Sequence, residues 1–182
     1  MISNLRKGWV KRMKKTKIII PIVILLIAIA GVATFFIIRN NKVKVDLNEL
    51  RFNLKWGRER TDVDSIMYRQ DGINKKTVDE RLGLAYEFED FLGVKGADGG
   101  IIMRFTEDDE LCAIMYTFSD ADSEAKTKIM ESIEAEINAQ YGECRNIAGT
   151  KMWVDDTTVV SIVGNHIVVF EDKKTVQEEI LG

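Results

Sequence analysis

A run of 21 residues without a charged side chain, Ile18 to Ile38, limits what this chain can fold into more than any other feature. As a helix rising about 1.5 Å per residue it would span about 31 Å, close to the roughly 30 Å hydrocarbon core of a bilayer. Inside a water-soluble domain such a helix would need apolar neighbours on every side. We therefore expect residues 18–38 to form a transmembrane helix in contact with the lipid bilayer.

The charges beside this run predict its orientation. Seven Lys or Arg residues and no Asp or Glu precede it, whereas only Arg39, Lys42 and Lys44 follow it before residue 46. By the positive-inside rule we expect residues 1–17 to be a basic cytoplasmic arm, 39–46 a tether, and the rest of a single-pass protein to lie outside the cytoplasm. A short basic arm beside a membrane span is expected to meet anionic lipid rather than nucleic acid.

A cleavable signal peptide is the alternative for the same segment. Ala28-Ile29-Ala30 has the small-x-small pattern that signal peptidase recognises. However, the apolar run continues through Phe35 and Phe36 to Ile38, which is unusual for a mature N-terminus. Cleavage after Ala30, which would release a secreted protein, remains open.

Composition divides the chain into two oppositely charged parts. Residues 1–45 carry ten Lys or Arg and no Asp or Glu, whereas residues 46–182 carry sixteen against 29, a net charge of −13. An acidic outer part argues against nucleic-acid ligands and favours solubility or a basic partner. Its 137 residues are enough for one domain with a core. Cys112 and Cys144 form a disulfide there or remain a core thiol and a loop thiol, and their spacing leaves both alternatives open.

Hydrophobic periodicity predicts one α+β domain over residues 47–172, followed by a short C-terminal helix over 173–182. Alternating apolar residues indicate strands, and apolar residues three to four positions apart indicate helices. The expected elements are a strand over 50–56 ended by Gly57, a short helix capped by Thr61, a polar loop over 71–76, strands over 82–88, 101–106 and 111–118, a helix from Asp122 to Tyr141, strands over 151–154, 158–163 and 166–171, and a last helix with Thr175 and Glu178 as its capping box. This order predicts two helices packed on a mainly antiparallel sheet, as a degenerate strand-helix-strand-strand duplication.

Two dipeptides at helix boundaries support a resemblance to a known family. Trp56-Gly57 directly precedes the first expected helix, and Tyr141-Gly142 closes the second. With this element order, residues 47–172 resemble small exported bacterial domains of the beta-lactamase-inhibitor-like kind. The resemblance implies helices on an antiparallel sheet, protein binding through a sheet face and no catalysis. Unlike those secreted domains, this chain carries a membrane anchor.

The sequence offers little for catalysis or cofactor binding. His166 is the only histidine, and no set of Cys or carboxylate ligands at zinc spacing accompanies it. The acidic turn 106–110 lacks the spacing and glycine of a calcium-binding EF-hand loop, and the glycine-rich segment 93–100 lacks the strand-to-helix context of a phosphate loop. Pairing of a cysteine with His166 would depend on the fold. We predict no catalytic, cofactor or metal residues.

One face of the expected sheet is the candidate site. If the aromatic residues of the central strands face the helices, the opposite face mixes apolar and charged side chains, which is typical of protein recognition. The candidate residues are Glu87, Glu89, Ile102, Arg104, Leu111, Met115 and Trp153. The two glutamates are expected to face Arg104 on a neighbouring strand. A sheet face covered by the C-terminal helix is the alternative.

These features predict a membrane-anchored, extracytoplasmic protein-binding module that is not an enzyme. An inhibitor, an immunity protein or a subunit of an envelope complex would fit, with another extracytoplasmic or envelope protein as the partner. The sequence leaves the oligomeric state unspecified. The alternative is an envelope enzyme of unrecognised type, which would be supported if substitution of His166 or Cys144 abolished an activity.

Overall fold

The computed structural model describes residues 43–76 and 83–181, which belong to one compact unit, Val43–Gly182. This unit begins before the predicted boundary at residue 47, and Val43 and Val45 pack against its core. The predicted cytoplasmic arm, the transmembrane segment 18–38 and residues 39–42 of the tether lie outside the described residues. Within the described ranges, no helix has the length and apolarity needed to cross a bilayer.

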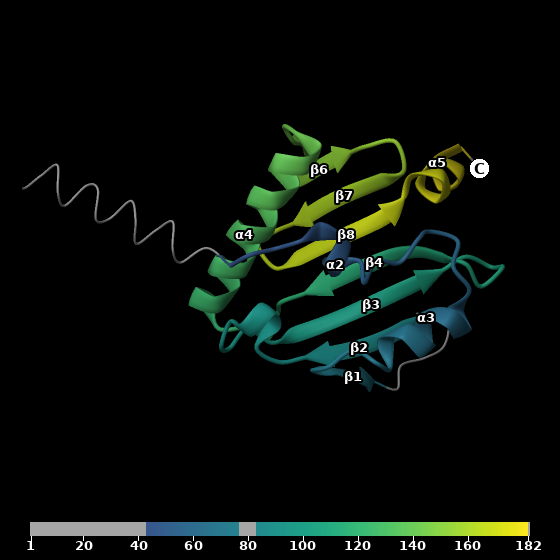
Figure 1. Cartoon of the computed structure of the whole chain (residues 1–182). Coiled ribbons are helices and arrows are strands. Elements are labelled where there is room, and N and C mark those ends of the chain that lie inside the picture. Colours follow the sequence, from purple (N-terminus) through teal and green to yellow (C-terminus); the bar gives the residue numbers. More distant parts are fainter. Residues whose placement is uncertain (1–42, 77–82, 182) are drawn as a thin grey trace, which may run out of the picture. The chain divides into compact units, whose positions relative to one another are not determined.

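The elements form two successive groups along the chain, and in each group helices precede four strands (Figure 1). The elements are α2 (Leu47–Leu50), α3 (Arg60–Met67), β1 (Ile73–Lys76), β2 (Leu84–Phe88), the 3-10 turn η2 (Phe91–Gly93), β3 (Gly99–Phe105), β4 (Leu111–Thr117), α4 (Ser123–Tyr141), β5 (Arg145–Ile147), β6 (Thr150–Val154), β7 (Thr158–Val163), β8 (Ile167–Asp172) and α5 (Lys173–Leu181). The predicted α+β class is therefore confirmed.

All the described strands form one antiparallel sheet in the order β1-β2-β3-β4-β8-β7-β6-β5. Helix α3 precedes the meander β1–β4, and helix α4 precedes the meander β5–β8. The two meanders meet where β4 pairs with β8. The repeated unit is thus a helix followed by four strands, and the predicted strand-helix-strand-strand unit is wrong.

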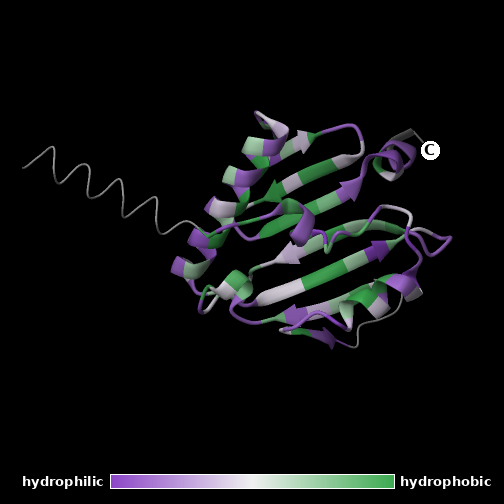
Figure 2. Ribbon diagram, viewed as in Figure 1, coloured by the Kyte–Doolittle hydropathy of each residue, from purple (hydrophilic) through white to green (hydrophobic). Residues whose placement is uncertain are grey.

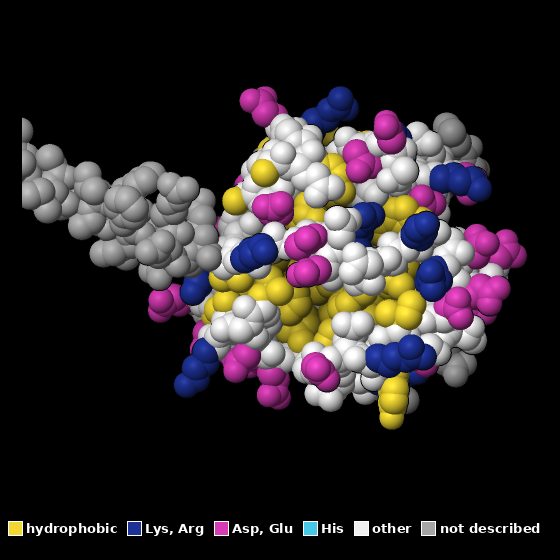
Figure 3. All heavy atoms as spheres, in the orientation of Figure 1, with side chains coloured by type: hydrophobic (Ala, Val, Ile, Leu, Met, Phe, Trp, Pro, Cys, Tyr) yellow, Lys and Arg dark blue, Asp and Glu magenta, His cyan; other side chains and the backbone are white. Residues whose placement is uncertain are grey.

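The hydrophobic core lies between the sheet and the helices α2, α3 and α4, which cover the same face in Figure 1. Apolar residues recur along the central strands, whereas α4 carries both hydrophilic and hydrophobic residues along its length (Figure 2). Rings of Phe88, Phe91, Tyr116 and Phe118 pack together with centroid distances of 4.6–6.4 Å. Some apolar surface remains visible around α2 on this side, ringed by charged side chains (Figure 3).

The predicted strand over 50–56 is wrong. Asp46 caps α2 by accepting hydrogen bonds from Asn48 N (2.8 Å) and Glu49 N (3.4 Å). Phe52 and Asn53 then adopt left-handed backbone angles, both with φ 53°, which an extended strand excludes. The core residues Leu47, Leu50 and Leu54 are three and four positions apart, so a helical spacing coexists with the alternating pattern.

Two short edge strands, β1 and β5, were not predicted. The segment expected to be a polar loop contains β1, and the segment after Gly142 contains β5, whose three residues are all exposed. An edge strand pairs on one side only and commonly carries charged residues. Both strands are therefore built from sequences without the apolar alternation of a half-buried strand.

The helix boundaries differ in their capping residues. Helix α3 begins at Arg60, with Glu59 rather than Thr61 at the N-cap. Before α5, Asp172 accepts hydrogen bonds from Thr175 N (3.2 Å) and Thr175 Oγ1 (2.9 Å), so Asp172 takes the capping role predicted for Thr175. The boundaries of α4 agree with the prediction, since it ends at Tyr141 before Gly142, whose φ is +82°.

Candidate binding face

The side of the sheet turned away from α2, α3 and α4 is called here the open face. Its residues alternate along each strand with the core residues. Strand register aligns Ile102, Met115, Val169, Ser161 and Met152 in one transverse row across β3, β4, β8, β7 and β6. None of these five belongs to the core cluster, and all but Ser161 are apolar, so the sheet carries a second set of apolar side chains.

Helix α5 covers one end of the open face. It contacts β7 and β8, and Glu179 Oε1 lies 3.5 Å from Nη2 of Arg104 on β3. Burial raises the pKa of Glu171 on β8; the Arg104 guanidinium partly offsets this rise and Glu179 adds to it. On the central strands, the charged residues Arg104 and Glu171 thus lie at the end covered by α5, which agrees in part with the covered-sheet alternative.

Beyond α5 the open face has no charged side chain across five strands. This uncharged strip consists of Gly100, Ile102, Met115, Thr117, Thr150, Met152, Ser161, Val163, Ile167 and Val169. At about 4.8 Å between neighbouring strands it is about 19 Å wide. Charged side chains lie at the two edges of the strip. At one edge Lys76 on β1 pairs with Glu87 on β2, and at the other Arg145 is exposed on β5. An apolar centre within a polar rim is typical of protein interfaces.

Three of the predicted site residues lie on the open face as expected, namely Ile102, Arg104 and Met115, and Glu87 lies at its edge. Glu89 follows the end of β2 in an exposed bend. The expected contact between the glutamates and Arg104 is wrong, because Lys76 pairs with Glu87 and Glu179 pairs with Arg104.

Leu111 and Trp153 are wrongly placed by the prediction, because both belong to the core. A register shift after Arg104 puts Phe105 opposite Leu111 and leaves Cys112 as the extra residue of a bulge. Leu111 therefore turns inward and is 1% exposed. Trp153 lies opposite the core residue Val160 on β7, and its Nε1 donates a hydrogen bond to Asn138 Oδ1 on α4 at 3.0 Å.

Six of the ten residues of the strip come from the second meander, and the prediction named none of them. Val169, Ile167, Val163 and Met152 all lie on the open face. The Gly164-Asn165 turn signal, with the alternation of β7 and β8 continued from it, could have placed the first three. The position of Met152 depends on its pairing with Ser161, which the short β6 segment does not specify by itself.

The described residues contain no group of three or more His, Cys, Asp or Glu side chains placed to hold a metal. The backbone carbonyl of His166 accepts a hydrogen bond from Phe118 N at 2.8 Å, so His166 lies beside Phe118. Phe118 is six residues further along the chain than Cys112. This separation is about 20 Å in an extended strand, so the two residues do not form a catalytic pair. Both cysteines are free, Cys112 buried and Cys144 exposed, so the intramolecular disulfide is also excluded.

Comparison with protein-family models, with curated proteins and with solved structures finds no match for this chain.

Proposed function

We propose that the chain is a membrane-anchored, extracytoplasmic module that binds another protein through the uncharged strip and performs no catalysis. The apolar segment 18–38 would be the anchor and residues 1–17 the cytoplasmic arm. The charge asymmetry around that segment and the acidic composition of residues 46–182 support this orientation. Inhibitor, immunity protein and envelope-complex subunit all remain within the proposal.

The observation that carries this proposal is the row from Ile102 to Met152, apolar except for Ser161, on a side of the sheet that the described helices leave open beyond α5. A charge-depleted centre about 19 Å wide suits a protein partner. A bilayer surface suits it less, because the strip has no Trp, Tyr or Phe side chain for the membrane interface. The likeness to beta-lactamase-inhibitor-like domains stays a proposal that rests on the dipeptides Trp56-Gly57 and Tyr141-Gly142.

Photo-crosslinking in intact cells tests this partner. A benzophenone amino acid at Met115, in the middle of the strip, is expected to give one discrete adduct with an extracytoplasmic protein. The matched control places it at Glu131, which is exposed on α4 on the other side of the sheet. Val169→Lys should reduce the Met115 adduct about tenfold, because a partner would bury the new charge unpaired. Equal adducts from both positions, or none from Met115, would refute the proposal.

The two cysteines provide a test of the proposed orientation. In intact cells, a membrane-impermeant maleimide is expected to label Cys144 and to leave Cys112 unlabelled. Cys144 is exposed, whereas Cys112 is buried, and burial raises the pKa of its thiol. A Cys144→Ser variant identifies the reacting thiol, and denaturant should make Cys112 reactive. Labelling of Cys144 only after the cells are permeabilised would place the domain in the cytoplasm.

A further inference from the structure

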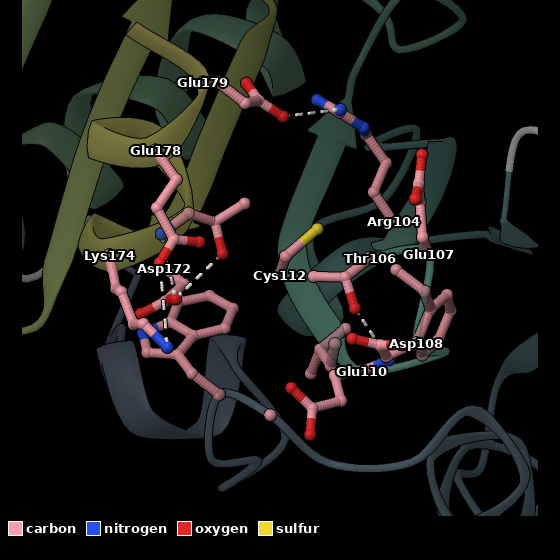
Figure 4. A pocket seen from close by; sticks show the side chains of 15 residues that line it. Arg104, Thr106, Glu107, Asp108, Glu110, Cys112, Asp172, Lys174, Glu178 and Glu179 are labelled. Carbon is pink, nitrogen blue, oxygen red and sulfur yellow. Dashed lines mark hydrogen bonds and ion pairs between the residues drawn. The ribbon is translucent and has the colours of Figure 1, made fainter. Parts of the chain in front are cut away.

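A pocket separate from the uncharged strip lies between α5 and the β3–β4 hairpin (Figure 4). It is called here the end pocket, and its volume is about 740 Å³. That size falls within the range of small-molecule sites, roughly 300–1,000 Å³. Residues from β3, β4 and α5 contribute to its wall, together with Trp56 from the segment after α2.

The end pocket has an excess of negative charge. Six carboxylates and two cationic side chains line it. Both cations are already engaged, since Arg104 pairs with Glu179 at 3.5 Å and Lys174 with Glu178 at 3.8 Å, as Figure 4 shows.

Three carboxylates remain uncompensated at the hairpin side. Within the described ranges, the side chains of Glu107, Asp108 and Glu110 form no ion pair or hydrogen bond. The remaining acid, Asp172, is already occupied by the hydrogen bonds from Thr175. The hairpin acids are therefore available to a positively charged group from outside the chain.

The rest of the pocket wall includes an aromatic ring and a thiol. The Trp56 ring is held by a hydrogen bond from its Nε1 to Thr158 Oγ1 at 3.1 Å, and it already has the Arg51 guanidinium carbon 5.8 Å from its centroid. Cys112 is 5% exposed, and its sulfur points into the space between α5 and Arg104 in Figure 4. None of the described residues hydrogen-bonds to this thiol. Thus a buried polar group without a partner faces the same pocket.

We propose that the end pocket binds an organic cation, an alkylammonium or guanidinium group, with the hairpin carboxylates as counter-charges and Trp56 as the apolar wall. Carboxylates combined with an aromatic ring are typical of sites for such cations. A divalent metal fits less well, because the described residues contain no group of three His, Cys, Asp or Glu side chains placed to hold one. The cation comes either from a free polyamine or from a lysine or arginine side chain of a peptide.

Isothermal titration of the full chain in detergent micelles at physiological salt tests the site, with spermidine and tetralysine as separate probes. Glu107→Gln with Glu110→Gln is expected to raise the Kd of the bound probe roughly tenfold, since two charge contacts are lost. The matched control is Glu131→Gln with Glu143→Gln, which removes two exposed charges away from the pocket and should leave Kd unchanged.

Binding of spermidine alone would identify a polyamine as the source, and binding of tetralysine alone a basic peptide; either result supports the site. Equal weakening by both pairs of substitutions, or no binding of either probe, would overturn it. Unchanged protection of Cys112 from maleimide verifies that each variant is folded. Met115→Ser should leave probe binding unaffected, so this result is independent of the partner proposed for the open face.

Discussion

Replacing Trp153 by alanine is expected to lower the free energy of unfolding by about 3–5 kcal/mol. The indole is 2% exposed and belongs to the core beneath α4. The substitution removes a large buried ring and leaves Asn138 Oδ1 without its indole donor. Trp153→Phe keeps most of the ring but loses the hydrogen bond, so it should cost about 1–2 kcal/mol.

The neighbouring residue supplies the control for this prediction. Met152 precedes Trp153 on β6 and points to the open face, so Met152→Ala should cost less than about 1 kcal/mol. Urea unfolding can be followed by labelling of Cys112 in a Cys144→Ser background, which reports on the outer domain independently of the membrane segment. If Met152→Ala cost as much as Trp153→Ala, the two faces of β6 would be assigned the wrong way round.

Met152 and Trp153 show how much of the fold the sequence pattern could predict. Strong alternation predicted the central strands, because core residues are two positions apart along each of them, such as Tyr86 and Phe88 or Tyr116 and Phe118. Alternation gives the two sides of one strand, but it does not say which side meets the helices. In β4, the residues that follow Leu111 determine which side of the strand faces the helices. At Leu111 the pattern fails because a bulge adds one residue, and no local sequence signal marks that insertion.

The end pocket could not be predicted for a different reason. Its carboxylates at 107–110 were correctly expected in a turn, and α5 was expected as a helix. However, their proximity arises only because β4 pairs with β8, which brings residues some 60 positions apart to the same end of the sheet. Long-range strand order of this kind depends on the packing of both meanders, and a single sequence does not specify it.

Replacing Gly99 by alanine is expected to cost about 2–4 kcal/mol, because β3 has no space for a side chain at this position. A Cβ at Gly99 would lie 2.0 Å from the Thr117 carbonyl oxygen on β4 and 2.8 Å from Cζ of Phe88 on β2. The carbonyl belongs to the backbone of a central strand and the ring is packed within the aromatic cluster. Neither neighbour can move without disturbing the core.

Gly100 is the matched control, since it is the next residue and faces the open side. A Cβ there would have its nearest contacts at 3.3 Å from the Tyr86 carbonyl oxygen and 3.5 Å from the Thr117 methyl group. Gly100→Ala should therefore change stability by less than about 1 kcal/mol, because the tight contact is offset by the smaller entropy of the unfolded chain. The same urea titration measures both variants. A loss of stability at Gly100 equal to that at Gly99 would mean that the open face is as closely packed as the core, and the uncharged strip would then have no room for a partner.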